Sequence, residues 1–360
     1  MSDIRNSVEE IYNTELDVLI NSETETIPEG WKMSPRSVLK FIIGGNVKGI
    51  EITPKYIGNK RLIEIAIATL LTDRALLLIG EPGTAKSWLS ENLAAAIKGN
   101  SNLIVQGTAG TTEEQVKYSW NYALLIAEGP SQKSLIKTPI FTAMETGQIA
   151  RFEEISRAVP EVQDSLISIL SEKMISIPEL GSIVKAKRGF SIIATANTRD
   201  KGVNEMSAAL KRRFNIVLLP FPKDLDTEIE IVKRRVSELS TSLKIDSPVP
   251  NDQLIKKIVT IFREIRSGKT LDQNEKLQIN SGGLSTAEAI SLIINSMSLA
   301  TSFGDGRVST DDVAAGLQGA IVKDESKDNI VWAEYLENII KKRGAEWKDL
   351  YESCLSFQEK

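Results

Sequence analysis

The stretch Ala75-Leu-Leu-Leu-Ile-Gly-Glu-Pro-Gly-Thr-Ala-Lys-Ser87 decides the fold of this chain. Residues 75–79 are all apolar and lie between Arg74 and Gly80, which is typical of a short strand buried on both faces of a parallel sheet. A turn with two glycines follows, and residues 86–97 are rich in alanine and leucine, which favours a helix. The stretch therefore predicts a strand, a tight turn and a helix in direct succession.

The turn, residues 80–87, follows the pattern G-x-x-x-x-G-K-[ST] at every position except Ala85. In such a turn the backbone N–H groups converge on phosphate oxygens, and the start of the helix adds its own donors. We expect Lys86 to reach the β- and γ-phosphates and the Ser87 hydroxyl to bind Mg²⁺. Alanine adds only a methyl group and tolerates a helix start. The loop therefore predicts ATP and Mg²⁺ as ligands, although no residue reads the base clearly enough to exclude GTP.

Two adjacent carboxylates, Glu153 and Glu154, end a second predicted strand that begins at Gln148. Ligand chemistry collects at the carboxyl edge of a parallel sheet, so we expect both acids to lie near the phosphate loop. Side chains alternate along a strand, so the two acids point differently. The first is expected to face Mg²⁺ or its water shell, and the second to polarise the attacking water. The alternative is that the two acids form an ordinary charged end of the strand and take no part in catalysis.

Two further polar positions are candidates for catalysis. Asn197 follows the apolar strand predicted over residues 191–196, where its amide is placed to orient a water or simply to make a turn. Arg213 lies in Lys211-Arg-Arg-Phe214, either as a member of a solvated basic cluster or as an arginine finger that stabilises charge on the γ-phosphate. A finger so far from the loop would serve the nucleotide of a neighbouring subunit, which implies an oligomer.

Composition excludes several classes of function. The 360 residues contain no histidine and one cysteine, so Ser-His-Asp hydrolysis, histidine metal sites and cysteine-rich zinc sites are ruled out. The net charge of −4 argues against a chain that lives on nucleic acid or anionic membrane. The N-terminus does not resemble a signal peptide, and residues 63–80 are too interrupted by charge to span a bilayer. We expect a cytoplasmic protein.

The order of elements predicts an α/β fold. Apolar strand patterns alternate with helical ones, which indicates βαβ units and a mainly parallel sheet with helices on both faces. The predicted strands are 75–79, 102–106, 148–152, 191–196 and 216–219. Helices are predicted before them over 4–20, 34–43 and 60–71, and between them over 86–97 and 160–172. After Pro222 only helices are predicted, over 225–239, 253–266, 285–303, 310–322 and from 330 to the end.

These motifs, in this order, resemble an AAA+ ATPase of the MoxR group. The phosphate loop resembles that group's own variant, in which alanine before the lysine is common. Glu153-Glu-Ile-Ser-Arg-Ala158 is similar to its Asp-Glu-Ile-Asn-Arg-Ala signature, and Ile192-Ile-Ala-Thr-Ala-Asn197 to its sensor 1 strand. Ala209-Leu-Lys-Arg-Arg-Phe214 resembles its arginine-finger segment. The resemblance covers residues 54–322, about three-quarters of the chain.

The resemblance implies a P-loop αβα sandwich followed by an all-α lid. The implied parts are an N-terminal helical segment 1–49, the ATPase core 50–223, the lid 224–324 and a C-terminal extension 325–360. Residues 118–147 correspond to the helix 2 insert and residues 174–189 to the hairpin before sensor 1, both of which face the pore or substrate in the family. The resemblance also implies a homo-oligomer, a hexameric ring, that acts as a chaperone or remodelling ATPase with a partner carrying a von Willebrand factor A domain.

Roles carry over only to matching positions. Glu154 is the water-activating acid, Asn197 is sensor 1, and Arg213 is the finger with Arg212 in reserve. Arg157 of the acidic signature is expected to face the adjacent subunit. Ser87 and Glu153 are the metal ligands. The residues expected to touch the nucleotide are Ile57 and Gly58, from their family position, and Gly80, Glu81, Pro82, Gly83, Thr84, Ala85, Lys86, Ser87 and Trp88.

Two departures from the family leave an alternative function open. Glu153 stands where the family has aspartate, and Gly283-Leu-Ser-Thr-Ala287 places alanine where the sensor 2 arginine is usual. Both changes favour a nucleotide-gated switch or scaffold with little hydrolysis. A motor that moves along nucleic acid is a third hypothesis, supported only by the basic run Lys185-Ala-Lys-Arg188 and disfavoured by the net negative charge.

Overall fold

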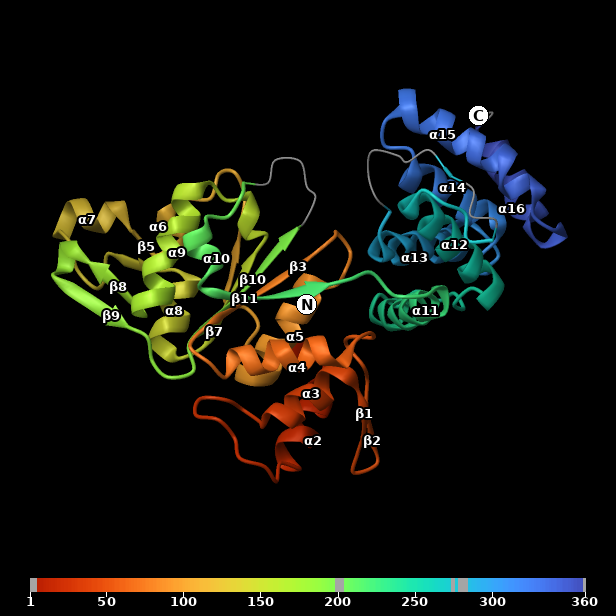
Figure 1. The fold of residues 1–360 in the computed structure, drawn as a ribbon. Helices are drawn as coiled ribbons and strands as arrows, with labels where there is room; N and C mark the ends of the chain where they lie inside the picture. The colour runs from red at the N-terminus through yellow and green to blue at the C-terminus, as the bar shows by residue number, and fades with distance from the viewer. Residues whose placement is uncertain (1–4, 198–203, 273–275, 278–283, 359–360) are drawn as a thin grey trace. The chain divides into compact units, whose positions relative to one another are not determined.

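The computed structural model describes residues 5–197, 204–272, 276–277 and 284–358 (Figure 1). Two compact units divide the chain, one formed by residues 1–220 apart from 82–84, and the other by residues 221–360 together with 82–84. The first unit contains the sheet, and the second is helical.

The first unit is built on a five-stranded sheet with the strand order β11-β3-β10-β7-β4. All four neighbouring pairs are parallel, which confirms the predicted α/β fold. Gly80 pairs with both Asn197 and Leu219, and Glu153 pairs with Gln106, so the carboxyl ends of the strands meet at one edge. The strands are β3 (Ala75–Gly80), β4 (Ile104–Gln106), β7 (Ile149–Glu153), β10 (Ser191–Asn197) and β11 (Phe214–Leu219).

Helices cover both faces of this sheet, and strand β3 shows why. Its side chains alternate, so Leu76 and Leu78 enter one apolar cluster while Ala75 and Leu77 enter the other. The first cluster includes residues of α3 (Pro35–Ile43), α4 (Lys60–Leu70) and α5 (Lys86–Lys98). The second includes residues of α8 (Pro139–Thr146) and α9 (Pro160–Glu172). The wholly apolar sequence of β3 therefore follows from burial on both sides.

The N-terminal region corrects one prediction. Instead of one helix over residues 4–20, the described part has α1 (Val8–Ile11) and α2 (Asn13–Asn21), while Ile4 lies outside the described residues. The break falls at Tyr12, whose ring packs edge-on against Phe41 at 6.0 Å and Trp88 at 6.3 Å. A hairpin of β1 (Gly45–Val47) and β2 (Ile50–Ile52) was not predicted, and its turn places Lys48 and Gly49 at positive φ.

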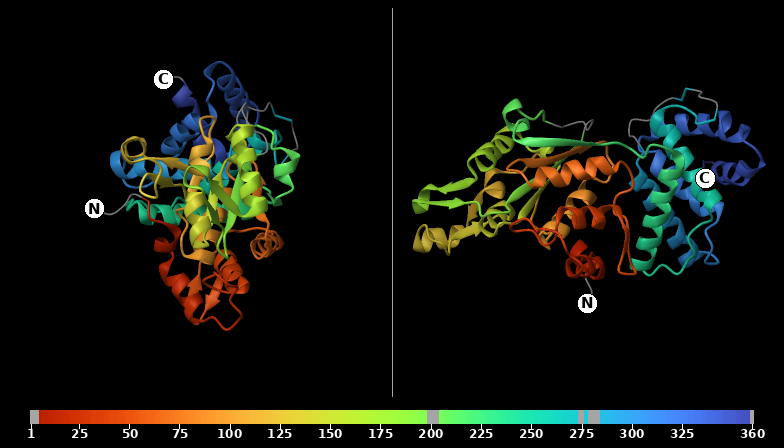
Figure 2. Two further views of the ribbon diagram at one scale, coloured as in Figure 1. Left: turned by 90° about the vertical axis from the view of Figure 1, so that its left-hand side faces the viewer. Right: turned by 60° about the horizontal axis from the view of Figure 1, so that its bottom comes forward.

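Two small hairpins extend from the sheet. Residues 118–147 form β5 (Tyr118–Trp120), α7 (Tyr122–Glu128), β6 (Leu135–Lys137) and α8, with α6 (Glu113–Val116) before them. The hairpin predicted within 174–189 is present as antiparallel β8 (Met174–Ile177) and β9 (Ser182–Lys185). The two hairpins lie side by side at one end of the first unit (Figures 1 and 2), where the Tyr118 hydroxyl donates to Glu179 at 3.0 Å. The remaining short elements are 3₁₀ segments Ile155–Arg157 and Pro178–Leu180, and α10 (Ala208–Lys211).

The second unit is a bundle of helices with its own apolar core. Each of the first four helices is capped at its start, because a side-chain oxygen of the preceding residue accepts a hydrogen bond from a backbone N–H of the first turn. The capping residues are Asp224, Asn251, Ser285 and Ser309. Trp332 and Tyr335 of the C-terminal helices stack at 5.8 Å within the core that the earlier helices share. The helices are α11 (Leu225–Ser242), α12 (Asp252–Ser267), α13 (Thr286–Phe303), α14 (Thr310–Ile321), α15 (Glu325–Asn338) and α16 (Lys348–Gln358), with 3₁₀ segments Ile340–Lys342 and Ala345–Trp347. Among the helices described, none is long and apolar enough to cross a membrane.

Candidate nucleotide-binding site

The phosphate loop joins β3 to α5 through two residues with left-handed backbone. Gly83 has φ of +79°, and Ala85 has φ of +62° and ψ of +25°. Alanine in this conformation costs about 1 kcal/mol relative to glycine, which is why glycine is usual at this position. The prediction treated Ala85 only as an added methyl group, whereas the structure shows that the difference is backbone strain. Strain of this kind is typical of ligand-binding turns.

Lys86 begins helix α5 and is almost completely buried. Its ammonium group donates to the carbonyl oxygens of Gly80 at 3.0 Å and Glu81 at 2.7 Å. The positive charge is therefore held within the loop itself. It lies beside the N-terminus of α5, where a phosphate group would meet both this charge and the positive end of the helix dipole.

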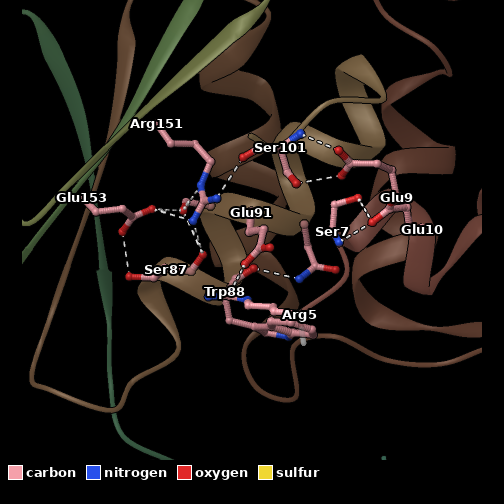
Figure 3. Close-up of polar contacts among 12 residues, drawn as sticks. Arg5, Ser7, Glu9, Glu10, Ser87, Trp88, Glu91, Ser101, Arg151 and Glu153 are labelled. Carbon is pink, nitrogen blue, oxygen red and sulfur yellow. Dashed lines mark hydrogen bonds and ion pairs between the residues drawn. The ribbon is translucent and has the colours of Figure 1, made fainter. Parts of the chain in front are cut away.

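Glu153 is the centre of a buried polar cluster, with 3% of its surface exposed (Figure 3). Its Oε2 accepts hydrogen bonds from Ser87 Oγ at 2.6 Å and Thr195 Oγ1 at 2.7 Å. Its Oε1 accepts from Ser90 Oγ at 2.5 Å and from the Arg151 guanidinium at 2.9 Å. Burial alone would raise the pKa of Glu153, but the charge of Arg151 and the three hydroxyl donors outweigh it, so the pKa lies below its ordinary value. The carboxylate is ionised at neutral pH.

This donor set fits a magnesium ion bound together with a nucleotide. Ser87 and Glu153 bring a hydroxyl and an ionised carboxylate into contact, and Mg²⁺ prefers such oxygen ligands. Within the described residues, no group of three or more acidic or cysteine side chains could hold a metal by itself. Mg²⁺ commonly uses one or two protein ligands and completes its shell with phosphates and water. The predicted metal ligands therefore lie together as that arrangement requires.

Glu154 follows Glu153 but lies in a different environment. Its backbone is left-handed, with φ of +54° and ψ of +45°, so the chain turns sharply as β7 ends. Its N–H donates to Thr195 Oγ1 at 3.0 Å, and its half-exposed carboxylate pairs with Arg157 at 2.7 Å. One acid is thus enclosed and the other open, because the chain leaves the strand at Glu154 rather than continuing its alternation. Arg157, expected to face an adjacent subunit, pairs with Glu154 in the single chain.

The remaining predicted residues divide between the two ends of the parallel strands, the carboxyl ends and the amino ends. Asn197 ends β10 opposite Gly80, so it lies at the edge that carries the phosphate loop. Arg213 precedes Phe214, which pairs with Ala75 at the start of β3, so it lies at the other edge, about 16 Å away. Its guanidinium donates to Ser171 Oγ at 2.9 Å and to the Ala209 carbonyl at 2.7 Å. The chain's own loop is out of its reach.

Arg212, the reserve finger, and Trp88, a predicted nucleotide contact, both form hydrogen bonds within the chain. The carbonyl of Arg212 accepts a hydrogen bond from Arg74 at 2.6 Å. The Trp88 indole N–H donates to the Lys55 carbonyl at 3.0 Å, which ties the segment carrying Ile57 and Gly58 to the start of α5. The contact of Ile57 and Gly58 with a base stays a prediction.

Four residues of the site were not predicted. Arg151, Ser90 and Thr195 surround Glu153, and Gly107 lies so close that an added Cβ would be 2.3 Å from the Glu154 carbonyl oxygen. Only Arg151 carried a signal, as a charge in an otherwise apolar strand. The others are ordinary polar or small residues whose importance depends on the register of distant elements.

The strand order, the phosphate loop and the paired acids at one edge define the nucleotide-binding core of an AAA+ ATPase. Residues 75–214 match the family described as AAA domain, dynein-related subfamily. Residues 226–358 match the family described as YehL-like AAA+ ATPase C-terminal domain. The chain belongs to the YehL-like AAA+ ATPases, because it is 39% identical over 352 residues to the uncharacterized protein YehL of Escherichia coli (strain K12), covering 95% of this chain and 94% of that protein.

More distant similarities cover less of the chain. The uncharacterized protein YojN of Bacillus subtilis (strain 168) is 26% identical over 201 residues, which cover 56% of this chain and 61% of that protein. The crystal structure of NtrX from Brucella abortus in complex with ADP has 13% sequence identity and a TM-score of 0.49, and covers 83% of this chain and 64% of that one.

Proposed function

We propose that this protein hydrolyses ATP with Mg²⁺ and uses the cycle to remodel a partner protein complex, as MoxR-like ATPases do. The observation that carries the proposal is the contact between Ser87 of the phosphate loop and the ionised Glu153, with the open carboxylate of Glu154 beside it. A metal-binding acid and a water-facing acid are the two groups that phosphate-anhydride hydrolysis needs next to a phosphate loop.

Each residue has a separate task in this proposal. The loop backbone and Lys86 bind the phosphates, and Ser87 with Glu153 holds Mg²⁺. The bound metal neutralises charge on the phosphate oxygens. Glu154 accepts a proton from the attacking water, and Asn197 orients that water at the same edge of the sheet. Thr195 holds both acids, because it donates to Glu153 and accepts from the Glu154 N–H.

The position of Arg213 supports a ring in which each subunit completes its neighbour's site. The residue lies at the sheet edge opposite its own loop, so a role on the γ-phosphate requires a second copy. We propose a homo-oligomeric, hexameric ring with Arg213 as the finger and Arg212 in reserve. The partner expected for such a ring is a protein with a von Willebrand factor A domain.

Three variants and one mixing experiment test the site by nucleotide binding and ATP turnover. Lys86→Ala should abolish nucleotide binding, whereas Glu154→Gln and Arg213→Ala should bind ATP normally and lose turnover by about 100-fold or more. Mixing the last two inactive variants should restore part of the activity, because a Glu154→Gln subunit still offers Arg213 to a neighbour with an intact Glu154. Full activity of the Arg213 variant, or no recovery on mixing, would remove the finger assignment.

A nucleotide-gated switch with little hydrolysis is the second candidate, and one observation favours it. Both oxygens of Glu153 are engaged by four protein donors, and Ala287 brings no cation to the sensor 2 position. Gly283, which begins that motif, lies outside the described residues. ATP binding without turnover, with and without a partner, would establish the switch. Turnover that Glu154→Gln abolishes would exclude it.

A further inference from the structure

Arg151 is a charged side chain inside a strand that is buried along its whole length. All five residues of β7 are buried, and Arg151 has 6% of its surface exposed. A guanidinium in such a place costs several kcal/mol unless its donors are paired. Every nitrogen of Arg151 has a partner: Nε donates to Ser90 Oγ at 3.1 Å, and one terminal nitrogen donates to the Ser101 carbonyl at 3.0 Å. The other terminal nitrogen donates to both the Ser87 carbonyl at 3.2 Å and Glu153 Oε1 at 2.9 Å.

These partners converge on the first turn of α5. Arg151 donates to the main chain of Ser87, and the Ser87 hydroxyl donates to the carboxylate of Glu153 (Figure 3). One turn later, Ser90 Oγ accepts from Arg151 Nε and also donates to Glu153. The rigid, planar guanidinium of Arg151 therefore contacts both the backbone of Ser87 and the carboxylate of Glu153, to which the Ser87 hydroxyl donates. A lysine could not do the same, because its ammonium is a single point of charge.

We propose that Arg151 is a positioning residue for the metal pair, which fixes the Ser87 hydroxyl and the Glu153 carboxylate in the arrangement that receives Mg²⁺. The inference rests on the proposed function of that pair. Glutamate has one more rotatable bond than aspartate, so its carboxylate needs an additional restraint to occupy one place. Arg151 supplies this restraint two residues earlier on the same strand and on the same face. The arginine and the glutamate thus form one unit.

Nucleotide affinity measured with and without metal isolates this role. Lys86 and the loop backbone bind phosphates directly, whereas Ser87 and Glu153 act on the nucleotide only through Mg²⁺. Loss of their positioning should therefore weaken binding in the presence of Mg²⁺ and leave binding in EDTA unchanged. Loss of a residue with only a structural role would weaken nucleotide binding equally in Mg²⁺ and in EDTA, or would lower the melting temperature alone.

The experiment titrates a non-hydrolysable ATP analogue into full-length protein in Mg²⁺ and in EDTA. The quantity compared is the affinity in Mg²⁺ divided by the affinity in EDTA. Arg151→Met should reduce this ratio by about 10-fold or more, in the range found when groups behind a metal ligand are removed. Arg151→Lys keeps the positive charge but not the planar donor group, and should also reduce the ratio. It keeps the test decisive if the methionine variant does not fold.

Ser101→Ala is the matched control. It removes the hydrogen bond that Ser101 Oγ donates to Glu9 at 2.7 Å but keeps the carbonyl that Arg151 contacts, so the ratio should equal that of the wild type. An unchanged or higher ratio in a folded Arg151→Met variant, or in Arg151→Lys, would overturn the positioning role. A wild-type protein whose affinity does not respond to Mg²⁺ would instead refute the metal assignment on which the inference rests.

Discussion

Two glutamates, one in each unit of the molecule, are buried beside arginines and yet differ in what they join. Glu153 meets Arg151 and three hydroxyl groups, all of them around the phosphate loop and the neighbouring strands. Glu228 of α11 is 1% exposed and accepts from Arg263 at 3.0 Å, from Arg266 at 2.8 Å and from Thr286 Oγ1 at 2.7 Å. These partners belong to α12 and α13, so Glu228 ties three helices of the bundle together.

The difference shows that the role of a buried ion pair follows from the residues that it contacts, and not from its burial. Both carboxylates bear the cost of leaving water, and both recover it through arginine and hydroxyl donors. The partners of Glu153 include the serine that is expected to bind metal, whereas those of Glu228 belong only to the packing of helices. We therefore expect changes at Glu228 to affect stability alone, and changes at Glu153 to affect both stability and ligand binding.

The largest effect is expected for Glu228→Ala. The substitution removes the carboxylate that Arg263 and Arg266 share, and leaves these partly buried guanidinium groups with main-chain carbonyl acceptors alone. It should therefore lower the free energy of unfolding by about 3 kcal/mol. Urea unfolding without nucleotide measures it. Glu230→Ala on the same helix is the control, because Glu230 is exposed and its loss should change stability by no more than about 0.5 kcal/mol. Equal values for the two variants would contradict the role given to Glu228.

A smaller loss of stability, about 2 kcal/mol, is expected for Glu153→Gln, because the amide keeps the shape and part of the hydrogen bonding. This variant should also lose the gain in nucleotide affinity that Mg²⁺ gives the wild type. Glu228→Gln, the matched change in the second unit, should keep that gain. If both variants respond to Mg²⁺ alike, the functional contrast between the two glutamates is wrong.

Removal of a single hydroxyl group tests the same contrast between the two glutamates with a smaller expected loss of stability. Thr195→Ala and Thr286→Ala each delete one donor to a buried carboxylate, and each should cost about 1 kcal/mol in unfolding free energy. Thr195 also accepts the N–H of Glu154, so its loss should lower ATP turnover as well. Turnover of the Thr286 variant should match the wild type. A normal rate in the Thr195 variant would show that Glu154 needs no such support.

The smallest effect concerns Lys98, a buried cation whose described hydrogen bond is to the Gly30 carbonyl at 2.6 Å rather than to a carboxylate. Burial lowers the pKa of Lys98 to about 8 from its ordinary 10.5. The unfolded chain then binds more protons between these values, so stability should rise as pH increases through that window. Relative to Lys98→Met, the wild type should gain about 1 kcal/mol of stability between about pH 8 and pH 10.5. A pH-independent difference would show that folding does not lower the pKa of Lys98.

Local patterns predicted the fold where the structure depends on neighbours in the sequence. The helix 160–172 was predicted with its observed bounds, because Pro160 starts it and the apolar spacing continues to its end. The two missed strand pairs, β1–β2 and β5–β6, have three residues in each strand. Strands so short have too few residues for an alternating pattern, and pairing across the hairpin stabilises them. The break at Tyr12 depends on rings from Phe41 and Trp88, which no local pattern reveals.

The sequence by itself determined the phosphate loop, the acidic pair and the parallel sheet, because each depends on contiguous residues with a recognisable order. Tertiary structure alone decided that Ala85 is left-handed, that Arg213 lies at the opposite edge from the loop, and that Arg151 meets Ser87. Ser87 and Glu153 are 66 residues apart, and Thr195 follows 42 residues later. Strand register and the packing of α5 bring them into contact, and a single sequence does not state the register.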